Sequence, residues 1–499
     1  MLIAPSSRPR VHRFALSVLL AMSAALGSCS REGSGPVIVS VIGARADLSK
    51  PLPNLPNPGA KLMLESTAQG LVAFDASGDI LPALAQRWIV EDDGRSYIFR
   101  LRRAFWADGA RVTAATVARL LTARIEAVRR LDPDGPLDAV EMVVPMTGEV
   151  IEIRLATARP FVLQMLAQPQ MALLTRKGGA GPYRAVPQGD ALLLTPVDRD
   201  NDDEDAEEDG LAPRHVRVLH AERAAKAIIR FREGLSALVL GGRFSDLPLL
   251  VPAGIDRDAV RADPVQGLFG LAVTGQGKLL ADDNVRAAIN MAIDRSQLPT
   301  LLPLGGWATT DRIMPDQLDL GRAPTAPAWA NMPLADRQAQ AMAAVAQWRT
   351  DNGAPPPLRI ALPPGPGSTL LFRLLRRDLA MIGLSVSRVG ANAVDADLRL
   401  VDEVAAYDSA LWYLGRIGCA RKISCNDEAD AQLQAASLAS SPDDRAARIA
   451  QAEALTMAHN GFIPLGTPIR WSLVSKRLNG FLLSPRARHP LNRLFRDTN

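Results

Sequence analysis

The chain has 499 residues, of which 47% are hydrophobic and 22% charged, with a formal net charge of +4. Because single hydrophobic cores generally stop growing at about 250–300 residues, we expect several domains. Three arginines near the N-terminus contribute most of the positive charge, and the chain beyond residue 28 is near +1. This balance gives no support to nucleic-acid binding, and we expect no nucleic-acid partner.

Residues 1–28 have the features of a signal peptide. Arg8, Arg10 and Arg13 precede an apolar run from Phe14 to Leu26. This run of about 13 residues is shorter than the roughly 20 that cross a bilayer core, and it has the length of a signal-peptide core. We therefore expect export.

The leader ends at Leu26-Gly27-Ser28-Cys29, which resembles the lipobox of bacterial lipoproteins. Cleavage would leave Cys29 as the lipidated first residue, with residues 29–36 as a flexible tether. The alternative is an ordinary secretory cleavage nearby, after which Cys29 is unmodified or lost. We expect a periplasmic protein that lipid anchors to a membrane. An Asp after the cysteine would favour retention at the inner membrane. Ser30 stands there instead, which weakly favours the outer membrane and leaves the choice of membrane open.

Cys419 and Cys425 are the two cysteines that remain. An even pair in an exported chain predicts a disulfide, which closes a small ring and contributes roughly 2 kcal/mol in the chain-entropy model. The alternative is half of a metal site, but the nearest histidine in sequence is the distant His459. The histidines form no cluster, which disfavours nickel, so we expect no metal and no cofactor.

Strands and helices are mixed along the chain, which predicts an α/β fold. Short apolar or alternating runs predict strands at Val37–Ile42, Tyr97–Leu101, Val150–Leu155, Leu358–Leu362 and Leu384–Val389. Apolar residues at helical spacing predict helices at Thr113–Val128, Val285–Arg295, Ala335–Trp348, Leu370–Met381 and Asp443–Met457. Asp282 or Asp283 is the expected cap of the second helix, and proline-rich breaks at 324–333 and 355–366 separate the next two.

The segment Asp198–Asp209 has nine acidic residues in twelve positions. Such a block repels itself and resists burial, so we expect a mobile surface loop. It lacks the central Gly and the closing Glu of a calcium-binding loop.

Four blocks of the sequence resemble a known family when taken in order. The first lies within Leu71–Val117 and reads Pro82, Leu84-Ala85, Trp88, Asp92-Asp93-Gly94, Tyr97, Phe99, Leu101-Arg102, Asp108-Gly109 and Thr113-Ala114. The other three are Gly179–Tyr183 (GAGPY), Val285–Arg295 (VRAAINMAIDR) and the weaker Leu379–Val386 (LAMIGLSV). Together they are similar to the large periplasmic solute-binding proteins of peptide- and nickel-type ABC transporters, family 5.

These motif residues also have a structural interpretation, which identifies a fold better than a ligand. We expect Gly94 and Gly109 to form tight turns, Trp88 and Tyr97 to pack in a core, and Arg286 to make a surface or inter-helix pair.

The resemblance implies a two-lobed periplasmic-binding-protein fold with an extra inserted domain. Lobe I would comprise residues 37–60, 165–267 and 475–499, the inserted lobe II residues 61–164, and lobe III residues 268–474. Hinge strands are expected at Leu268–Val273 and near Pro464–Trp471, so that the lobes close over a solute.

The implied function is a monomeric receptor that captures a peptide or peptide-like solute and delivers it to an ABC permease. In peptide-binding members the extended ligand pairs as an added strand. An enzyme is disfavoured, because the sequence has no G-x-S-x-G, H-E-x-x-H or G-x-x-x-x-G-K motif. The alternative function is a surface lipoprotein that uses the same fold for sensing or adhesion.

Residues 407–412 resemble a family strand that ends in Trp, here Trp412. Peptide-binding relatives commonly follow this Trp with an Asp that holds the ligand's α-amino group. Residues 413–419 contain no acid, and Asp427 comes only after the second cysteine. The missing carboxylate removes a charge-assisted bond of roughly 1.5–3 kcal/mol, so a free amine would be held less well.

Four residues are candidates for the solute site. Arg416 either faces the cleft, where its planar fork suits a carboxylate or phosphate, or pairs at the surface with Asp427 or Glu428. Trp412 and Tyr413 form either a stacking wall or part of a core. Phe269 is a candidate from its place in the expected hinge, with core packing as the alternative.

Overall fold

The computed structural model describes residues 35–49, 57–131, 135–197, 215–316, 318, 320, 322–439 and 441–496. The expected signal peptide, Cys29 and the acidic run 198–209 lie outside the described residues, so the predictions made for them stay predictions. Within the described ranges, no helix combines the length and the apolar character that a membrane span needs.

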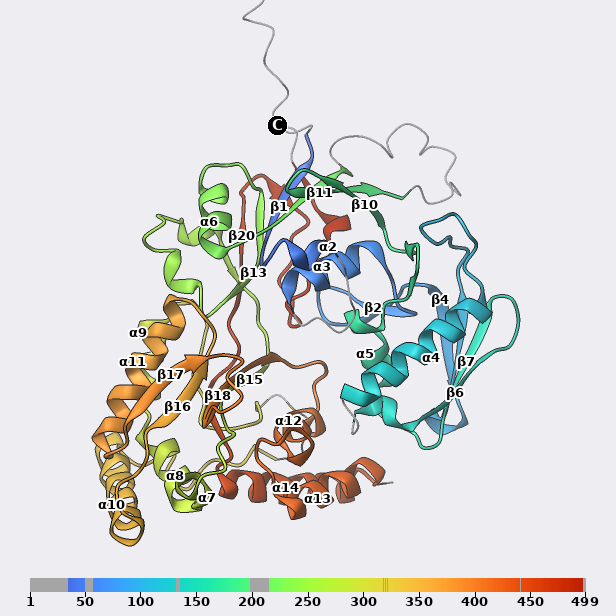
Figure 1. Cartoon of the computed structure of the whole chain (residues 1–499). Coiled ribbons are helices and arrows are strands. Elements are labelled where there is room, and N and C mark those ends of the chain that lie inside the picture. Colours follow the sequence, from blue (N-terminus) through green and yellow to red (C-terminus); the bar gives the residue numbers. More distant parts are fainter. Residues whose placement is uncertain are drawn as a thin grey trace, which may run out of the picture.

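A seven-stranded sheet has the strand order β10-β11-β12-β1-β13-β20-β14 (Figure 1). Its central strand β1 (Val37–Ile42) is the predicted first strand and runs parallel to β12 and β13. Val37, Val39 and Val41 are fully buried, since alternate side chains of a strand share one face. The other strands are β10 (Tyr183–Gln188), β11 (Ala191–Pro196), β12 (Arg217–Glu222), β13 (Leu238–Arg243), β14 (Val260–Ala262) and β20 (Arg470–Val474).

Helix α3 (Pro58–Thr67) packs beside this sheet. Pro58 occupies the first turn, where a missing N–H costs nothing, and the Asn57 side chain accepts a hydrogen bond from the Ala60 amide at 2.7 Å. Helices α2 (Ala46–Ser49) and α6 (Ala224–Arg232) belong to the same part of the molecule.

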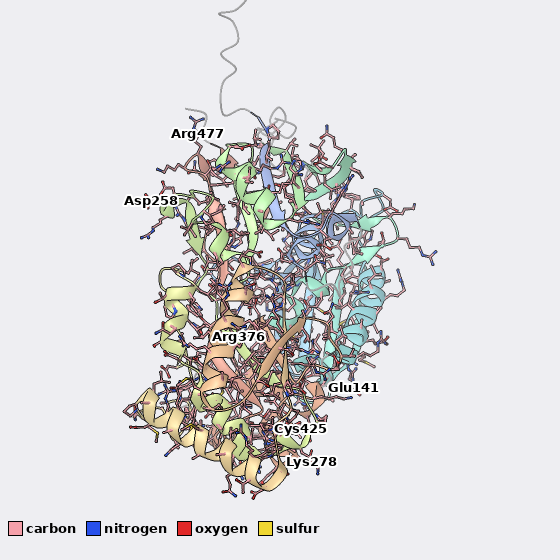
Figure 2. The ribbon with its side chains drawn as sticks, turned by 60° about the vertical axis from the view of Figure 1, so that its left-hand side comes forward. Glu141, Asp258, Lys278, Arg376, Cys425 and Arg477 are labelled. Atoms are coloured by element: carbon pink, nitrogen blue, oxygen red, sulfur yellow. A yellow bond between two sulfur atoms is a disulfide. The ribbon has the colours of Figure 1, made fainter. Side chains whose placement is uncertain are left out.

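A five-stranded sheet has the order β17-β16-β18-β15-β19. Its strands are β15 (Gly267–Val273), β16 (Leu358–Leu362), β17 (Val386–Gly390), β18 (Leu398–Val404) and β19 (Phe462–Gly466). Around it lie α7 (Lys278–Ala281), α8 (Asp283–Ala292), α9 (Leu298–Leu301), α10 (Leu334–Asn352), α11 (Pro366–Met381), α12 (Ala410–Ile417), α13 (Asp427–Leu438) and α14 (Pro442–His459). In Figure 2 the labelled Lys278 and Arg477 mark opposite ends of the molecule.

A four-stranded antiparallel sheet, β4-β5-β7-β6, forms a third unit with the helix α4 (Ala114–Leu131). Its strands are β4 (Ala85–Glu91), β5 (Ser96–Leu101), β6 (Val140–Pro145) and β7 (Val150–Leu155). Gly94 and Gly109 have φ of 86° and 81°, a conformation that favours glycine, so their expected role in turns is confirmed. The shorter elements are β2 (Val72–Phe74), β3 (Ile80–Pro82), α5 (Val162–Leu166), β8 (Leu174–Thr175), β9 (Gly178–Gly179), β21 (Leu478–Asn479) and β22 (Phe495–Arg496).

The ends of two predicted helices differ from the structure for a clear physical reason. The motif helix begins as expected, with the Asp282 side chain accepting from the Asn284 and Val285 amides, but it ends at Ala292 because Ile293 is extended. Helix α11 begins inside the predicted proline-rich break, since Pro366 fits a first helical turn. Arg286 is buried and donates to the His459 carbonyl at the end of α14, which agrees with an inter-helix pair, one of its two expected roles.

The expected strand that ends in Trp412 is wrong. Strand β18 ends at Val404, and Trp412 lies in α12. The Ser409 side chain accepts a hydrogen bond from the Leu411 amide, which starts the helix.

The domain ranges stay a prediction, but one observation concerns the C-terminal end of the range predicted for lobe III. Strand β20 pairs with β13 and β14 of the seven-stranded sheet, although its residues 470–474 lie within the range predicted for lobe III. The chain therefore crosses between the two large sheets before residue 470.

Replacing Phe269 by Ala tests the core of the five-stranded sheet. Its side chain is 1% exposed, so we expect the free energy of unfolding to fall by roughly 3–5 kcal/mol, measured by urea unfolding. Phe495→Ala is the matched control, because Phe495 is 50% exposed. Equal effects of the two substitutions would contradict this placement.

Candidate functional site

Residues 402–408, which we call the junction segment, join the end of β18 to α12. The Asp402 carboxylate accepts a hydrogen bond from Arg470 Nη1 at 2.7 Å, and Arg470 Nη2 donates to the Asp402 carbonyl at 3.0 Å. Asp402 lies in the five-stranded sheet and Arg470 in the seven-stranded one. The two large sheets are therefore tied together at this segment.

Other parts of the chain contact the same segment. The ring of Phe161, next to α5, stacks on Tyr407 with centroids 5.1 Å apart. Gln168 Nε2 donates to the Ala406 carbonyl at 2.7 Å. Arg486, from the C-terminal segment, donates to the Ala405 carbonyl at 3.1 Å and pairs with Asp408 at 2.6 Å. The junction segment thus lies where all three sheet units meet.

Arg416 lies beside the junction segment. Its Nε donates to Glu403 Oε2 at 2.5 Å, which places its guanidinium on β18. This contact with Glu403 is one that we did not consider from the sequence. An arginine held on this strand stands next to the meeting point of the lobes.

Trp412 and Tyr413 are 8% and 0% exposed, with their rings edge to face at 4.9 Å. They belong to one buried apolar cluster that also contains Phe99 and Ile151 of the four-stranded sheet. In this state both residues therefore pack in a core. The buried hydroxyl of Tyr413 nonetheless has no hydrogen-bond partner among the described residues, an arrangement that costs free energy. Burial, together with the negative charge of Asp408, raises the pKa of this phenol.

Phe269 does not adjoin these residues through its side chain. Its ring packs edge-on against Phe244 and Trp307, at centroid distances of 5.1 and 6.3 Å. This placement agrees with core packing, the alternative to a direct contact with a solute.

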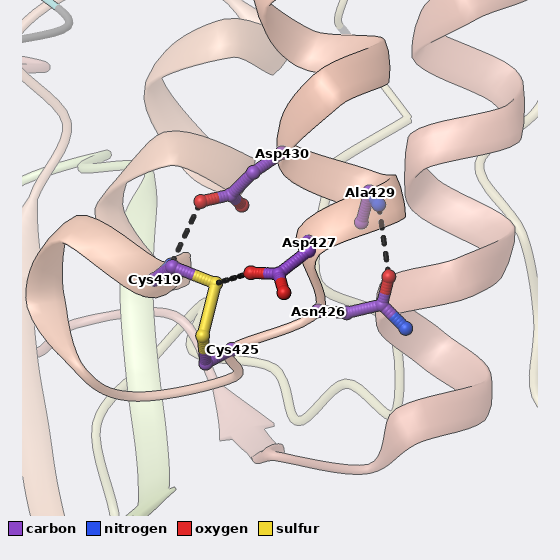
Figure 3. The surroundings of a disulfide bond; sticks show 6 residues. All are labelled: Cys419, Cys425, Asn426, Asp427, Ala429 and Asp430. Atoms are coloured by element: carbon purple, nitrogen blue, oxygen red, sulfur yellow. Dashed lines mark hydrogen bonds between the residues drawn. A yellow bond between two sulfur atoms is a disulfide. The ribbon is translucent and has the colours of Figure 1, made fainter.

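Cys419 and Cys425 are joined by a disulfide (Figure 3), in agreement with the expectation for an exported chain. The loop is held to α13, because the Cys419 amide donates to Asp430 Oδ2 at 3.0 Å and Asn426 caps the helix at the Ala429 amide. Asp427 Oδ1 lies 3.7 Å from Cys419 Sγ. These three side chains are near enough to share a metal, but bonded sulfurs offer no thiolate ligands.

The sequence analysis did not single out two charged residues of α3, Lys61 and Glu65. Arg488 donates to Glu65 Oε1 at 2.8 Å and to the Ala167 carbonyl at 2.8 Å. Lys61 lies one turn before Glu65. Burial, and then the charges of Arg243 and Arg470, lower the pKa of Lys61. The side chain is nevertheless accessible to water. The sequence did offer a signal for these residues, because they are two charges in a mostly apolar segment.

Comparisons with known proteins agree with this fold. Residues 79–210 match the model of the bacterial extracellular solute-binding proteins, family 5, middle segment. OppA of Haemophilus influenzae, in a complex with the peptide RPPGFSPFR, superposes with a TM-score of 0.76 at 16% identity, covering 93% of this chain and 99% of that one. Residues 79–210 are therefore similar to the family 5 middle segment, and the chain has the two-lobed fold seen in family 5 binding proteins.

Two Escherichia coli proteins extend the comparison. The murein tripeptide binding protein MppA gives a TM-score of 0.76 at 18% identity, over 92% of this chain and 98% of that one, and its unliganded open form gives 0.61. The probable deoxycholate-binding periplasmic protein YgiS is 42% identical over 59 residues, which span 12% of this chain and 11% of that protein. All are binding proteins rather than enzymes, as the sequence predicts for this chain.

Removing the disulfide by a Cys419→Ser, Cys425→Ser double substitution should lower the free energy of unfolding by roughly 2 kcal/mol, the value for a small ring. Urea unfolding measures this difference. A reductant should destabilise the wild type by the same amount and leave the double variant unchanged. A wild type that is insensitive to the reductant would contradict the prediction.

Lys61→Met should raise the free energy of unfolding at neutral pH. The folded state lowers the pKa of Lys61, so the folded chain bears a cost while this amine is protonated in both states. As pH rises towards the ordinary value of 10.5, the unfolded chain also loses this proton. The advantage of the variant should therefore shrink with increasing pH. Denaturant unfolding of both proteins across this range measures the difference, and an advantage that grows with pH would contradict it.

Proposed function

We propose that the protein is an extracytoplasmic receptor that captures a peptide or peptide-like solute between its lobes and delivers it to an ABC permease. It acts as a periplasmic monomer that the lipid on Cys29 holds at a membrane. The observation that carries the proposal is the family fold over nearly the whole chain, with three units meeting at the junction segment. Trp412, Tyr413 and Arg416 adjoin this segment and remain the proposed wall of the solute site.

The edge of β18 supports a peptide-like solute. Strand β16 pairs with β18 only at Leu398 and Arg399, and β15 takes the other side. Among the described strands, residues 400–404 have no partner on the β16 side. An extended ligand can add there as a strand, with main-chain hydrogen bonds giving affinity.

The end groups of the solute follow from the charges nearby. Asp408, which precedes Trp412, pairs with Arg486, so it already has a cation and does not replace the missing acid after Trp412. A free α-amino group is therefore not the feature that this site selects. An amphipathic acid, like the deoxycholate in the name of YgiS, is a second chemistry to test.

The experiment is a binding screen of the purified protein with native mass spectrometry and thermal shift. A small solute should co-purify from the native host, or a member of a panel of short peptides and deoxycholate should raise the melting temperature. If the folded protein retains no solute and no member of the panel raises its melting temperature, the receptor function is overturned.

The place of Arg416 is tested with the solute so found. Arg416→Ala should weaken binding by roughly tenfold or more, as expected for the loss of a hydrogen bond from a charged group, measured by calorimetry. Arg376→Ala, at an exposed position of α11, is the control and should bind like the wild type. Unchanged affinity of the Arg416 variant would remove this residue from the site.

A further inference from the structure

Two cations near the junction segment, Lys61 and Arg243, lack a side-chain hydrogen bond within the part of the chain that the structure describes. The nearest acid to Arg243 is Asp402, with Nη1 and Oδ2 4.0 Å apart. That same carboxylate is already bonded through its other oxygen to Arg470. Asp402 Oδ2 is buried and itself lacks a hydrogen bond. The pair Arg243–Asp402 is therefore incomplete as it stands.

Lys61 and Arg243 belong to elements in contact. Gly241 of β13 has φ of 84° and lies so close to α3 that an added Cβ would be 2.9 Å from the Pro58 side chain. Lys61 follows Pro58 by one turn, and Arg243 follows Gly241 by two residues at the end of the same strand. The positive charge of Arg243 is one of the causes that lower the pKa of Lys61. Two like charges thus lie close enough to repel each other.

The local charge balance leaves an excess of positive charge. The other cations near Lys61 are Arg470 and Arg488, which bond to Asp402 and Glu65 respectively. Partly buried cations are expensive when unpaired, and proteins normally pair them. Asp402 and Asp246 are the acids close to Arg243. The four cations Lys61, Arg243, Arg470 and Arg488 still outnumber the three acids Asp402, Asp246 and Glu65, so the surroundings favour an added anion.

We propose that Lys61 and Arg243 bind an oxyanion of the solute, so that the receptor takes acids, with a carboxylate such as a peptide C-terminus as the expected group. The guanidinium supplies a planar fork that fits two oxygens, and the ammonium adds a point charge. This inference rests on the proposed function, because it names the chemistry of the solute at the same lobe junction.

Binding an anion here also couples the lobes. Arg243 lies at the end of β13 and Lys61 on α3, both on the side of the seven-stranded sheet, while Asp402 belongs to β18. A solute oxyanion held by both cations would approach the open edge of β18 with its main chain. The acid group then fixes the orientation of an added strand, which main-chain pairing alone leaves open.

The test compares Lys61→Gln and Arg243→Gln with Lys278→Gln and Arg376→Gln. The two control residues are exposed, and Figure 2 labels both away from Arg477 and the seven-stranded sheet. Each protein is purified from the native host, its retained solute is released by denaturation, and the solute is identified and quantified by mass spectrometry. The probes for calorimetry are that released solute and its methyl ester or other neutral derivative.

We expect the released solute to carry a carboxylate or a phosphate, and its neutral derivative to bind at least roughly tenfold more weakly to the wild type. The affinity of Lys61→Gln and of Arg243→Gln for the acid should fall by about the same factor, and their affinity for the neutral derivative should change little. Both control variants should keep wild-type affinity. Near-UV circular dichroism establishes that the variants are folded.

A solute without an anionic group, or full affinity in both site variants, would overturn the oxyanion site and leave the receptor function standing. If the folded wild type retains no solute and responds to no member of the panel, the receptor function itself fails, and this inference with it.

Discussion

The contact between Asp402 and Arg470 is the constraint on which the arrangement of this protein depends. Both side chains are largely buried, at 9% and 11% exposed, and the arginine bonds to both the carboxylate and the carbonyl of its partner. Such a pair is costly to break, because removing one partner leaves a buried charge alone. It fixes the end of β18 against the start of β20. Phe161, Gln168 and Arg486 then contact residues 405–408, a short way beyond Asp402.

Much of this architecture is readable from the sequence, for reasons that differ between elements. β1, β7 and β16 match their predicted ranges, since short apolar runs with buried faces have few alternatives. The motif helix α8 was placed by its Asp282 cap. Trp412 was misplaced because resemblance to a relative's strand carried no information on Ser409, whose side chain starts a helix at that point.

The site itself was harder to predict than the fold. Arg416 and the pair Trp412 and Tyr413 were found because they follow a motif, and they do lie beside the junction segment. Lys61 and Arg243 carry no motif, and their proximity depends on the packing of α3 on β13, which links residues nearly two hundred positions apart. The contact of Arg416 with Glu403 was not foreseen for the same reason, since Glu403 lies on β18 and not on the adjacent loop.

The chain passes between the two large sheets twice, from β14 to β15 and from β19 to β20. These links are short, residues 263–266 and 467–469, and they run side by side because β14 pairs with β20 and β15 pairs with β19. Two neighbouring connections of this kind form a hinge. They permit rotation about the line that joins them and oppose sliding or twisting of one half against the other. Any rotation of one large sheet against the other would thereby take place about a single axis.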